Sequence, residues 1–402
     1  MILLSHPTGN ANVRGVLKAL ESAGVLDSFY TSLGVSDTET IPWWRSPFKN
    51  RHYPVPQTKL KLRPLRECTR LLASKFNWEP LTRHEIGWAS IDSVYRDLDH
   101  AMSLALRRNG KQLKAVYCYE DGALETFRAA RELGLRRVYD LPIAYWEAAQ
   151  QLLQEEVQRL PAWASTLCGA KDSPAKLSRK AEEMELAEVV ICPSQFVANS
   201  LPEQVRSSKK IAVTLFGSPT IAPAKTAADF LPGRKLRVLF AGSMSQRKGL
   251  GDLLAAMRRL NRSDVELVIM GAPQVPMEFY RKEFNEFTFE PGRPHAQVLT
   301  LMRSCDVFCL PSIFEGRALV MQEAMSQGLP LIITPNTGGA DLIEEGVTGF
   351  IVPIREPDRI AERISWFADN RSSLPEMSRA AQANAGRLTW ESYGQAVMNA
   401  VL

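Results

Sequence analysis

The sequence predicts an α/β protein of two domains, each built on a parallel sheet. The chain has 402 residues, 45% of them hydrophobic, and this length exceeds what one core usually supports. Residues 306–334 have the pattern strand, helix, strand, which forms a parallel crossover unit. Residues 236–257 have the order strand, glycine-containing turn, helix. The same alternation in the first half indicates a second unit of this kind.

In the first half we expect a helix at 12–23 and short apolar strands at 1–5, 115–119, 137–140 and 189–191. The turn His6 to Gly15 follows the first strand and opens the helix. Gly9 and Asn10, with Asn12, are therefore candidates to contact a phosphate of one substrate, the donor, or to contact a second substrate, the acceptor. Simple N-capping of the helix by Asn10 or Asn12 is the alternative, and the sequence leaves both open.

Two further strand ends carry polar residues. Glu120 and Asp121 follow the strand at 115–119, while Asp140 ends the next strand and precedes Tyr145. Open α/β sheets bind ligands at the carboxyl ends of their strands, so Asp121, Asp140 and Tyr145 are candidate cleft or acceptor residues. Helix caps and turn residues are an equally good interpretation.

The tripeptide Asp97, Leu98 and Asp99 matches a D-x-D metal motif. Apolar residues at 94, 98, 102 and 105 nevertheless predict a helix with Leu98 in the core and the two aspartates on the polar side. There is no zinc spacing of His and Cys and no G-x4-GK-[ST] loop. We therefore expect no bound metal and no tightly bound cofactor.

The stretch 45–83 carries ten Lys or Arg and two Glu, a net charge of +8 in a chain whose total is +5. Aromatic residues lie in it and at its edge: Trp43, Trp44, Phe48, Tyr53, Phe76 and Trp78. An apolar stripe follows helical spacing: Leu65, Cys68, Leu72 and Phe76. This combination favours an anionic membrane surface as a partner. An anionic polysaccharide and a solvated loop are the alternatives, whereas no nucleic-acid-binding module accompanies the charge.

No apolar run is long enough to span a membrane, and the N-terminus turns polar too early for a signal peptide. Six cysteines without CxxC pairing sit mostly in apolar strand-like sequence: Cys68, Cys118, Cys168, Cys192, Cys305 and Cys309. Cysteines at such positions are typically reduced and buried in the protein core. We therefore expect a cytoplasmic protein, with possible peripheral attachment to the inner face of a membrane.

Residues 220–234 are rich in Pro and Ala and lack periodicity, which predicts a linker between an N-terminal domain at 1–219 and a C-terminal domain at 235–389. After the strand that opens the second domain come Gly242 and the adjacent cations Arg247 and Lys248. Two cations near a positive helix end suit a diphosphate ligand. Two ordinary surface cations are the alternative.

The segment 310–349 places Glu315 and Glu323 eight residues apart, beside glycine-rich turns. On a helix this spacing separates the carboxylates by roughly 12 Å, so they can reach different parts of one ligand. Gly316 keeps the approach to the helix N-terminus open for an anion or for sugar hydroxyls. Two surface glutamates on a solvated helix are the alternative for either residue alone.

Together these segments resemble the signature of the family 4 (group 1) nucleotide-sugar glycosyltransferases. The pattern is PS-x-x-EG-x-x-L-x-x-x-EA-M-x-x-G-x-P followed by GG and GVTGF, together with G-x5-K-G around Lys248. The chain departs from the family at Arg317 and Ala318, where Phe and Gly are common. It also departs at Ser243, where relatives often carry an arginine that Arg247 is expected to supply.

The resemblance implies the GT-B architecture, in which two Rossmann-like domains face each other across a cleft. It also implies retaining, metal-independent, hexosyltransferase-like transfer from a nucleoside diphosphate sugar to a hydroxyl of a glycan or a lipid-linked acceptor. Glu315, Arg247 and Lys248 are the expected catalytic residues. The expected donor-binding residues are Glu323 at the ribose, Gly242, Ser243, Gly316, Arg317, Ala318 and, near the base, Gly271 and Arg293. The final helix, 390–402, is expected to cross back onto the N-terminal domain.

Two other functions are open. A GT-B sugar-nucleotide epimerase needs additional acids and bases in the cleft, and the sequence shows no obvious set. A non-enzymatic scaffold that binds nucleotide or glycan is expected to lose the glutamate pair or the Arg-Lys pair, and both pairs are present.

Overall fold

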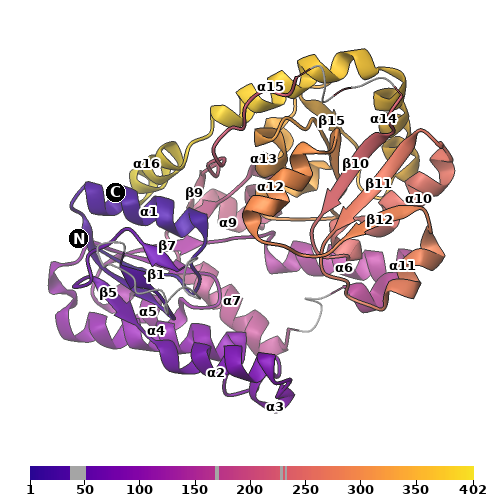
Figure 1. Cartoon of the computed structure of the whole chain (residues 1–402). Coiled ribbons are helices and arrows are strands. Elements are labelled where there is room, and N and C mark those ends of the chain that lie inside the picture. The colour runs from indigo at the N-terminus through magenta and orange to yellow at the C-terminus, as the bar shows by residue number, and fades with distance from the viewer. Residues whose placement is uncertain (37–50, 168–171, 227–229, 231–232) are drawn as a thin grey trace.

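The computed structural model describes residues 1–36, 51–167, 172–226, 230 and 233–402. It contains one parallel sheet in each half of the chain, of seven and of six strands (Figure 1). We call the units built on these sheets the N-terminal and C-terminal domains. The aromatic residues Trp43, Trp44 and Phe48, and Cys168, lie outside the described residues.

The N-terminal sheet has the order β5-β2-β1-β6-β7-β8-β9, and all its neighbouring strands run parallel. Its strands are β1 (Ile2–Ser5), β2 (Leu26–Thr31), β5 (Leu60–Leu62), β6 (Ala115–Tyr119), β7 (Arg136–Asp140), β8 (Val189–Cys192) and β9 (Lys210–Val213), and β3 (Val35–Ser36) pairs separately with β4 (His52–Tyr53). The helices of this half are α1 (Ala11–Ser22), α2 (Pro64–Lys75), α3 (Glu79–Thr82), α4 (Ile91–Asn109), α5 (Leu124–Glu132), α6 (Trp146–Arg159), α7 (Pro174–Leu186), α8 (Gln195–Ser200) and α9 (Glu203–Ser208), with 3₁₀ turns η2 (Gly110–Gln112) and η3 (Pro161–Thr166).

The C-terminal sheet has the order β12-β11-β10-β13-β14-β15. Its strands are β10 (Leu236–Ala241), β11 (Val265–Met270), β12 (Phe287–Glu290), β13 (Val307–Leu310), β14 (Leu331–Ile333) and β15 (Gly349–Ile351). The helices that follow are α10 (Leu250–Leu260), α11 (Met277–Glu283), α12 (His295–Arg303), α13 (Leu319–Ser326), α14 (Pro357–Asp369), α15 (Leu374–Gly386) and α16 (Trp390–Val401), with 3₁₀ turns η5 (Gln246–Lys248), η6 (Pro335–Thr337), η7 (Ala340–Leu342) and η8 (Arg371–Ser373).

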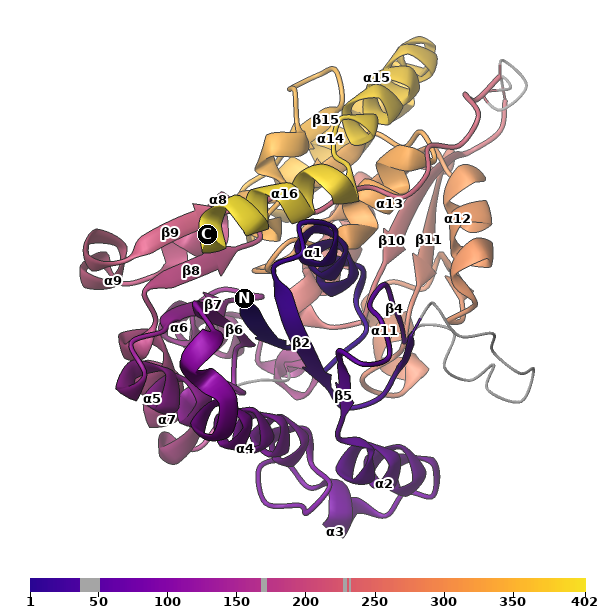
Figure 2. The ribbon, with the colours of Figure 1, turned by 90° about the vertical axis from the view of Figure 1, so that its left-hand side faces the viewer.

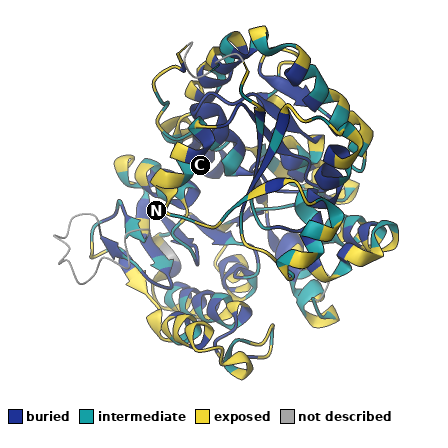
Figure 3. Ribbon diagram, turned by 45° about the vertical axis from the view of Figure 1, so that its right-hand side comes forward, coloured by how far each residue is buried: buried dark blue, intermediate teal, exposed yellow. Residues whose placement is uncertain are grey.

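The central strands of both sheets are buried, as Figure 3 shows in dark blue. Helices cover both faces of each sheet, so β1, β8 and β13 are apolar along their length and each is buried at all four positions. The predicted strands in both halves are therefore confirmed. In the first sheet β2, β5 and β9 were not predicted; they carry polar residues and lie toward or at the sheet edge, where the apolar signal is weaker. In the second sheet β11, β12 and β15 were not predicted either, although β11 is an inner strand that is largely buried.

The last helix, α16, crosses back onto α1 of the N-terminal domain, as expected (Figure 2). Two glycines allow the close contact. A Cβ on Gly394 would lie 2.5 Å from the Gly15 carbonyl oxygen, and a Cβ on Gly15 would lie 3.2 Å from the Tyr393 ring. The termini of the fold are thereby tied together although they are far apart in sequence.

The helix predicted around Leu98 is α4, and Leu98 is buried in it. The expectation that both aspartates lie on its polar side is wrong for Asp99. Asp99 is buried and accepts hydrogen bonds from the backbone of Glu125 and Thr126 at 2.8 Å each, so it caps α5. Asp97 instead pairs with Arg63 on the surface.

The first sheet ends at Val213 and the second begins at Leu236, so the expected linker lies between them, with 227–229 and 231–232 outside the described residues. The domain limits stay a prediction. One segment in particular, α6 with η3, contacts the C-terminal domain although it precedes the linker: Trp163 lies in the same hydrophobic core as Leu239 and Leu253 (Figure 1).

Candidate functional site

The order of the C-terminal sheet reverses between β10 and β13, so the loops after these two strands diverge from neighbouring positions. Open α/β sheets bind ligands outside the carboxyl ends of the strands at such a switch point. The loop after β10 carries Arg247 and Lys248, and the loop after β13 carries Glu315. Two sequence motifs that are far apart along the chain therefore meet at one place.

Two glycines shape the loop after β10: Gly242 in the loop itself and Gly271 at the end of the neighbouring strand β11. Gly242 has φ of 155°, and a Cβ on Gly271, at the end of β11, would lie 1.7 Å from the Gly242 carbonyl oxygen. The two backbones therefore touch, and any side chain at Gly271 would displace the loop. Gly271 supports the shape of the Gly242 turn, and this contact explains its place beside the site.

Arg247 and Lys248 both bind the carboxylate of Glu315. The Glu315 Oε1 atom lies 2.8 Å from the Arg247 guanidinium and 2.7 Å from the Lys248 ammonium. Burial lowers the pKa of Lys248, and the neighbouring Glu315 carboxylate opposes this shift. Since two cations share one carboxylate, this group of three side chains carries a net positive charge. Such a group is suited to an anionic ligand.

A pocket of about 450 Å³ opens beside this group. It gathers six of the predicted site residues: Gly242, Ser243, Lys248, Arg293, Ala318 and Glu323. Glu323 accepts a hydrogen bond from the exposed His295 ring at 3.0 Å, and Arg293 pairs with Glu290. Apolar side chains that the sequence analysis did not single out complete the lining: Met270, Val298, Leu319 and Val320. Their apolar character is also that of core residues, so no sequence signal distinguishes them.

Arg317 does not lie in this pocket. Its side chain is buried, forms two bonds to Asp341 at 2.7 and 2.9 Å, and also binds Gln322 and the Gly338 carbonyl. Arg317 was expected among the donor-binding residues, but these contacts turn its guanidinium to Asp341, Gln322 and Gly338. Its guanidinium is committed to joining the start of α13 to the turn at Gly338, and the partner Asp341 is too distant in sequence to be foreseen.

Gly316 lies at the contact between the two domains. A Cβ on it would lie 1.8 Å from the Pro142 carbonyl oxygen, and its own carbonyl accepts a bond of 2.6 Å from the Ser194 hydroxyl. Pro142 and Ser194 follow β7 and β8, so the carboxyl ends of the N-terminal strands meet the loop after β13. The missing side chain of Gly316 thus serves close packing of the domains. Its expected role in keeping the approach to α13 open for a ligand stays a prediction.

The candidate residues of the N-terminal domain have mixed environments. The Gly9 carbonyl accepts a bond from Arg14, and Asn10 is the N-cap residue of α1 without a side-chain cap bond. Asp121 forms ion pairs with Lys176, Arg179 and Lys180 at 3.2 to 3.7 Å. Asp121 is therefore already neutralised by its neighbours.

Asp140 and Tyr145 are both buried. The Tyr117 hydroxyl donates to Asp140 at 2.8 Å, and burial raises the pKa of Asp140 to about 7.

His6, which follows β1, was not among the expected site residues. The ring of His6 is buried against Tyr119, its pKa is lowered by burial to about 4, and its Nε2 atom has no hydrogen-bond partner among the described residues.

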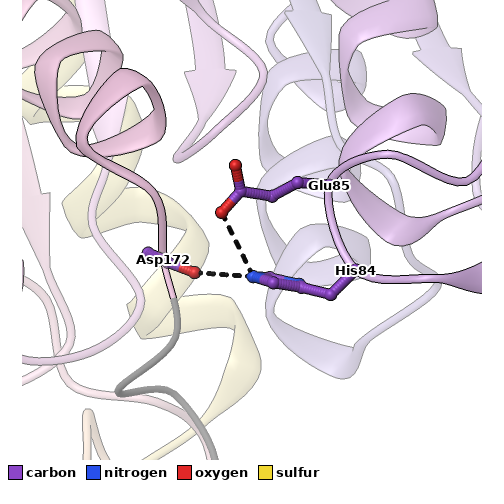
Figure 4. A group of neighbouring side chains, drawn as sticks. All are labelled: His84, Glu85 and Asp172. Atoms are coloured by element: carbon purple, nitrogen blue, oxygen red, sulfur yellow. Dashed lines mark hydrogen bonds and ion pairs between the residues drawn. The ribbon is translucent and has the colours of Figure 1, made fainter.

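Among the described residues, one group of three potential metal ligands lies together: His84, Glu85 and Asp172 (Figure 4). The His84 Nε2 atom lies 3.0 Å from Asp172 and 3.3 Å from Glu85. Lys176 lies 3.1 Å from Asp172, so a cation already compensates this carboxylate. The group is thus an ion-pair network, and the expected metal independence stays a prediction.

Within the described residues, no helix is both long and apolar enough to cross a membrane.

Residues 224–386 match the family model described as glycosyl transferases group 1. D-inositol 3-phosphate glycosyltransferase of Segniliparus rotundus is 27% identical over 245 residues, which are 55% of this chain and 54% of that protein. The GDP-mannose-dependent alpha-mannosyltransferase of Corynebacterium glutamicum is 31% identical over 163 residues, 40% of this chain and 38% of that protein. The chain thus spans about half or less of the length of these curated relatives.

Two solved structures match nearly the whole chain. Sucrose-phosphate synthase from Thermosynechococcus elongatus has a TM-score of 0.66 at 18% identity, covering 99% of this chain and 97% of that one. Alr3699/HepE of Anabaena in complex with UDP has a TM-score of 0.63 at 16% identity, covering 99% and 98%. At such identities the likeness concerns the fold alone. It confirms the GT-B architecture.

Proposed function

We propose that the protein transfers a sugar from a nucleoside diphosphate sugar to an acceptor hydroxyl, because residues 224–386 match the family model of the group 1 glycosyl transferases. The product belongs to glycan, glycolipid or polysaccharide biosynthesis. The observation that carries this proposal is the net positive group of Arg247, Lys248 and Glu315, next to a pocket that also holds Glu323. Similar proteins support the donor class, since they include a GDP-mannose-dependent alpha-mannosyltransferase and a structure in complex with UDP.

The diphosphate is proposed to replace Glu315 as the partner of the two cations. We call residues 242–249, the loop after β10, the diphosphate loop. As the sugar bond breaks, negative charge grows on the departing diphosphate, and Arg247 and Lys248 are near enough to stabilise it. Exchange of partners also frees the Glu315 carboxylate, which then accepts hydrogen bonds from sugar hydroxyls and orients the sugar.

The other donor residues are assigned by their place in the pocket. Glu323 accepts bonds from the two ribose hydroxyls in place of His295, whose ring is exposed and free to move aside. Gly242, Ser243 and Ala318 present backbone to the donor, and the base lies toward Gly271 and Arg293. The reaction is proposed to retain the anomeric configuration without a metal ion, with the leaving phosphate taking the acceptor proton. The acceptor then enters from the N-terminal domain, near Gly9 and Asn10.

A thermal-shift screen against UDP, GDP, ADP and their common sugars tests the donor site. A ligand at 100 times its Kd stabilises the folded state by about 2.7 kcal/mol, so a cognate nucleotide raises the Tm selectively. Lys248→Met is expected to abolish this shift and to lower kcat/KM for transfer by about 10²-fold, because it removes a charge aimed at the leaving group. Lys282→Met, which changes an exposed lysine of α11 in the same domain, is the matched control.

Product analysis separates the alternatives. Sugar transfer or slow donor hydrolysis supports a transferase, whereas a changed sugar still attached to nucleotide indicates an epimerase. Tight nucleotide or glycan binding without turnover indicates a scaffold. A shift that persists unchanged in Lys248→Met contradicts the diphosphate site.

We also propose that the N-terminal domain docks on an anionic membrane. Nine of the sixteen exposed large hydrophobic side chains of the described residues are concentrated between residues 62 and 91. These nine are Leu62, Leu65, Leu71, Leu72, Phe76, Trp78, Ile86, Trp88 and Ile91. Figure 1 shows α2 and α3 together at the lower edge of this domain. We call this set the apolar surface.

Helix α2 contributes Leu65, Leu71 and Leu72 to the apolar surface, because it turns apolar residues to solvent and a charged residue to the interior. It buries Glu67, which binds Arg51 and Arg70, and it exposes the predicted stripe of Leu65, Cys68, Leu72 and Phe76 to solvent. Cations surround the exposed side chains, among them Arg66 over the Trp88 ring at 5.0 Å and Lys75 near the Phe76 ring. Apolar side chains with interleaved cations match the headgroup region of an anionic bilayer, where a lipid-linked acceptor resides.

A further inference from the structure

Segment 146–166 comprises α6 and η3 and lies on the C-terminal domain. The indole of Trp163 is buried and packs edge-on against Phe279 at 4.9 Å and Tyr280 at 5.7 Å. A Cβ on Gly251, in the first turn of α10, would lie 2.9 Å from the Trp163 ring. The segment is thus packed directly against the helix that follows the diphosphate loop.

The end of this segment holds the backbone of the diphosphate loop. The Gln246 backbone N–H donates to the Thr166 hydroxyl oxygen at 3.0 Å, and that hydroxyl donates to the Trp163 carbonyl at 2.7 Å. Thr166 and Gln246 are both buried. A lost partner there leaves a backbone donor without water to replace it.

The side chain of Gln246 is held as firmly as its backbone. Its amide nitrogen donates to Glu156 at 2.9 Å and to Asp252 at 2.8 Å, and its amide oxygen accepts from the Gly251 backbone at 2.9 Å. Glu156 belongs to α6, whereas Asp252 belongs to α10. Gln246 therefore joins a helix of the first half of the chain to the first turn of α10.

Charge balance makes this buried group stable. Arg159 binds Asp252 through two bonds of 2.8 Å and also binds Glu156, which Arg355 contacts from its other side. Burial alone would raise the pKa of Glu156, but bonds from Arg159 and Gln246 hold that pKa below its ordinary value. Both carboxylates are thus paired with Arg159, and a buried polar network requires such pairing.

The next two residues after Gln246 are Arg247 and Lys248. The Arg247 carbonyl accepts a bond from the Ile313 backbone at 2.9 Å, so the loop is fixed at Gln246 and again at the peptide between the two cations. We propose that segment 146–166 is a positioning element for the diphosphate loop, acting through Thr166 and Glu156 on Gln246. This inference rests on the proposed function, and none of these three residues touches the donor pocket. It makes the affinity for the diphosphate depend on a part of the chain outside the residues matched to the family.

The test compares Thr166→Val with Thr166→Ser. Valine keeps the size of threonine but removes the hydroxyl that accepts from Gln246, whereas serine keeps it. We expect Thr166→Val to weaken UDP binding about tenfold, as a buried donor loses its partner, and UMP binding about threefold or less. If the nucleotide screen selects guanine, the test compares GDP with GMP instead of UDP with UMP. Thr166→Ser is expected to restore the affinity for the diphosphate.

Each outcome bears on one of the two proposals. Wild-type protein that binds none of the diphosphates overturns the inference together with the proposed function. Wild-type protein that binds UDP or GDP, with the same affinity in Thr166→Val, overturns the inference alone. An equal loss for the diphosphate and the monophosphate also overturns it, because a merely structural defect does not distinguish the two ligands.

Hydrogen exchange of the unmutated protein keeps the inference testable even where Thr166→Val does not fold. We expect the amides of residues 245, 246, 248 and 249 to be protected before any nucleotide is added, since Gln246 donates to Thr166 and the other three donate within the loop that this bond holds. Rapid exchange of these amides in the free protein, followed by protection only after addition of UDP or GDP, would show that the ligand orders the loop. That result overturns the positioning role.

Discussion

Glu315 holds Arg247 and Lys248 through a single carboxylate oxygen, Oε1. Burying a lysine without a partner is costly, and the observed pairing avoids that cost. The same pairing keeps both cations beside the pocket, where the proposed diphosphate would replace Glu315 as their partner. At this scale the site is a small ion-pair group whose charge is only partly balanced.

Asp140 allows a test of the buried carboxylates of the N-terminal domain. Burial raises its pKa from 3.8 to about 7. Between these values the folded state binds more protons at Asp140 than the unfolded state does. The contribution of Asp140 to the free energy of unfolding therefore falls as the pH rises from about 4 to 7.

We expect Asp140→Asn, which keeps an acceptor for Tyr117, to stabilise the protein more at pH 8.5 than at pH 5 by about 1–3 kcal/mol. The measurement is the Tm of variant and wild type across this range. Asp358→Asn, at an exposed aspartate of α14, is the control. A Tm difference that stays constant with pH would mean that Asp140 is ionised in the folded protein throughout.

At the scale of single elements, α2 differs from an ordinary surface helix. An amphipathic helix normally turns its apolar side to the core, but α2 buries Glu67 and exposes Leu65 and Leu72, at 69% and 56% of their surface. Arg51 and Arg70 make this possible because they pair with the buried carboxylate. The helical spacing was predictable, whereas the direction in which the stripe faces was not.

Vesicle cosedimentation tests the membrane proposal on α2. Burying one leucine side chain is worth roughly 1.5–3 kcal/mol, so the double variant Leu65→Gln, Leu72→Gln is expected to weaken binding to phosphatidylglycerol-rich vesicles at least about tenfold. Leu104→Gln with Leu133→Gln, two exposed leucines elsewhere on the same domain, is the matched control. Equal binding of all three proteins, or binding to neutral phosphatidylcholine alone, refutes docking through this surface.

At the scale of the whole molecule, both domains contribute contacts to the region of the site. Gly316 touches Pro142 and Ser194, α16 returns to α1, and segment 146–166 reaches the C-terminal domain. A small apolar cluster joins the same regions, with Leu153 and Leu167 against Ile313 and Phe314. The loop after β13, which carries Glu315, therefore makes several of the contacts that fix the position of one domain relative to the other.

Gly316→Ala is expected to disturb this arrangement. The added methyl group would lie 1.8 Å from the Pro142 carbonyl, so the domains must separate or the loop must shift. We expect a loss of about 1–3 kcal/mol in stability and a lower kcat/KM for transfer. Gly292→Ala, where no atom lies within 4 Å of the new Cβ, is the control. Wild-type Tm and kinetics in Gly316→Ala would exclude a role for this contact.

The α/β class, most of the inner strands and the spacing of the motifs around Lys248 and Glu315 could be predicted from the sequence, whereas the inner strand β11 was not. Apolar runs and glycine turns are local signals, and parallel strands place their carboxyl ends at one edge of a sheet. Only the tertiary structure decided where individual side chains point. Arg317 turns to Asp341, Asp99 caps α5, and Gln246 meets Glu156 because each partner is distant in sequence and charge pairing in a buried site depends on three-dimensional contact. The apolar lining of the pocket was equally hidden, since a ligand-contacting valine and a core valine look alike along the chain.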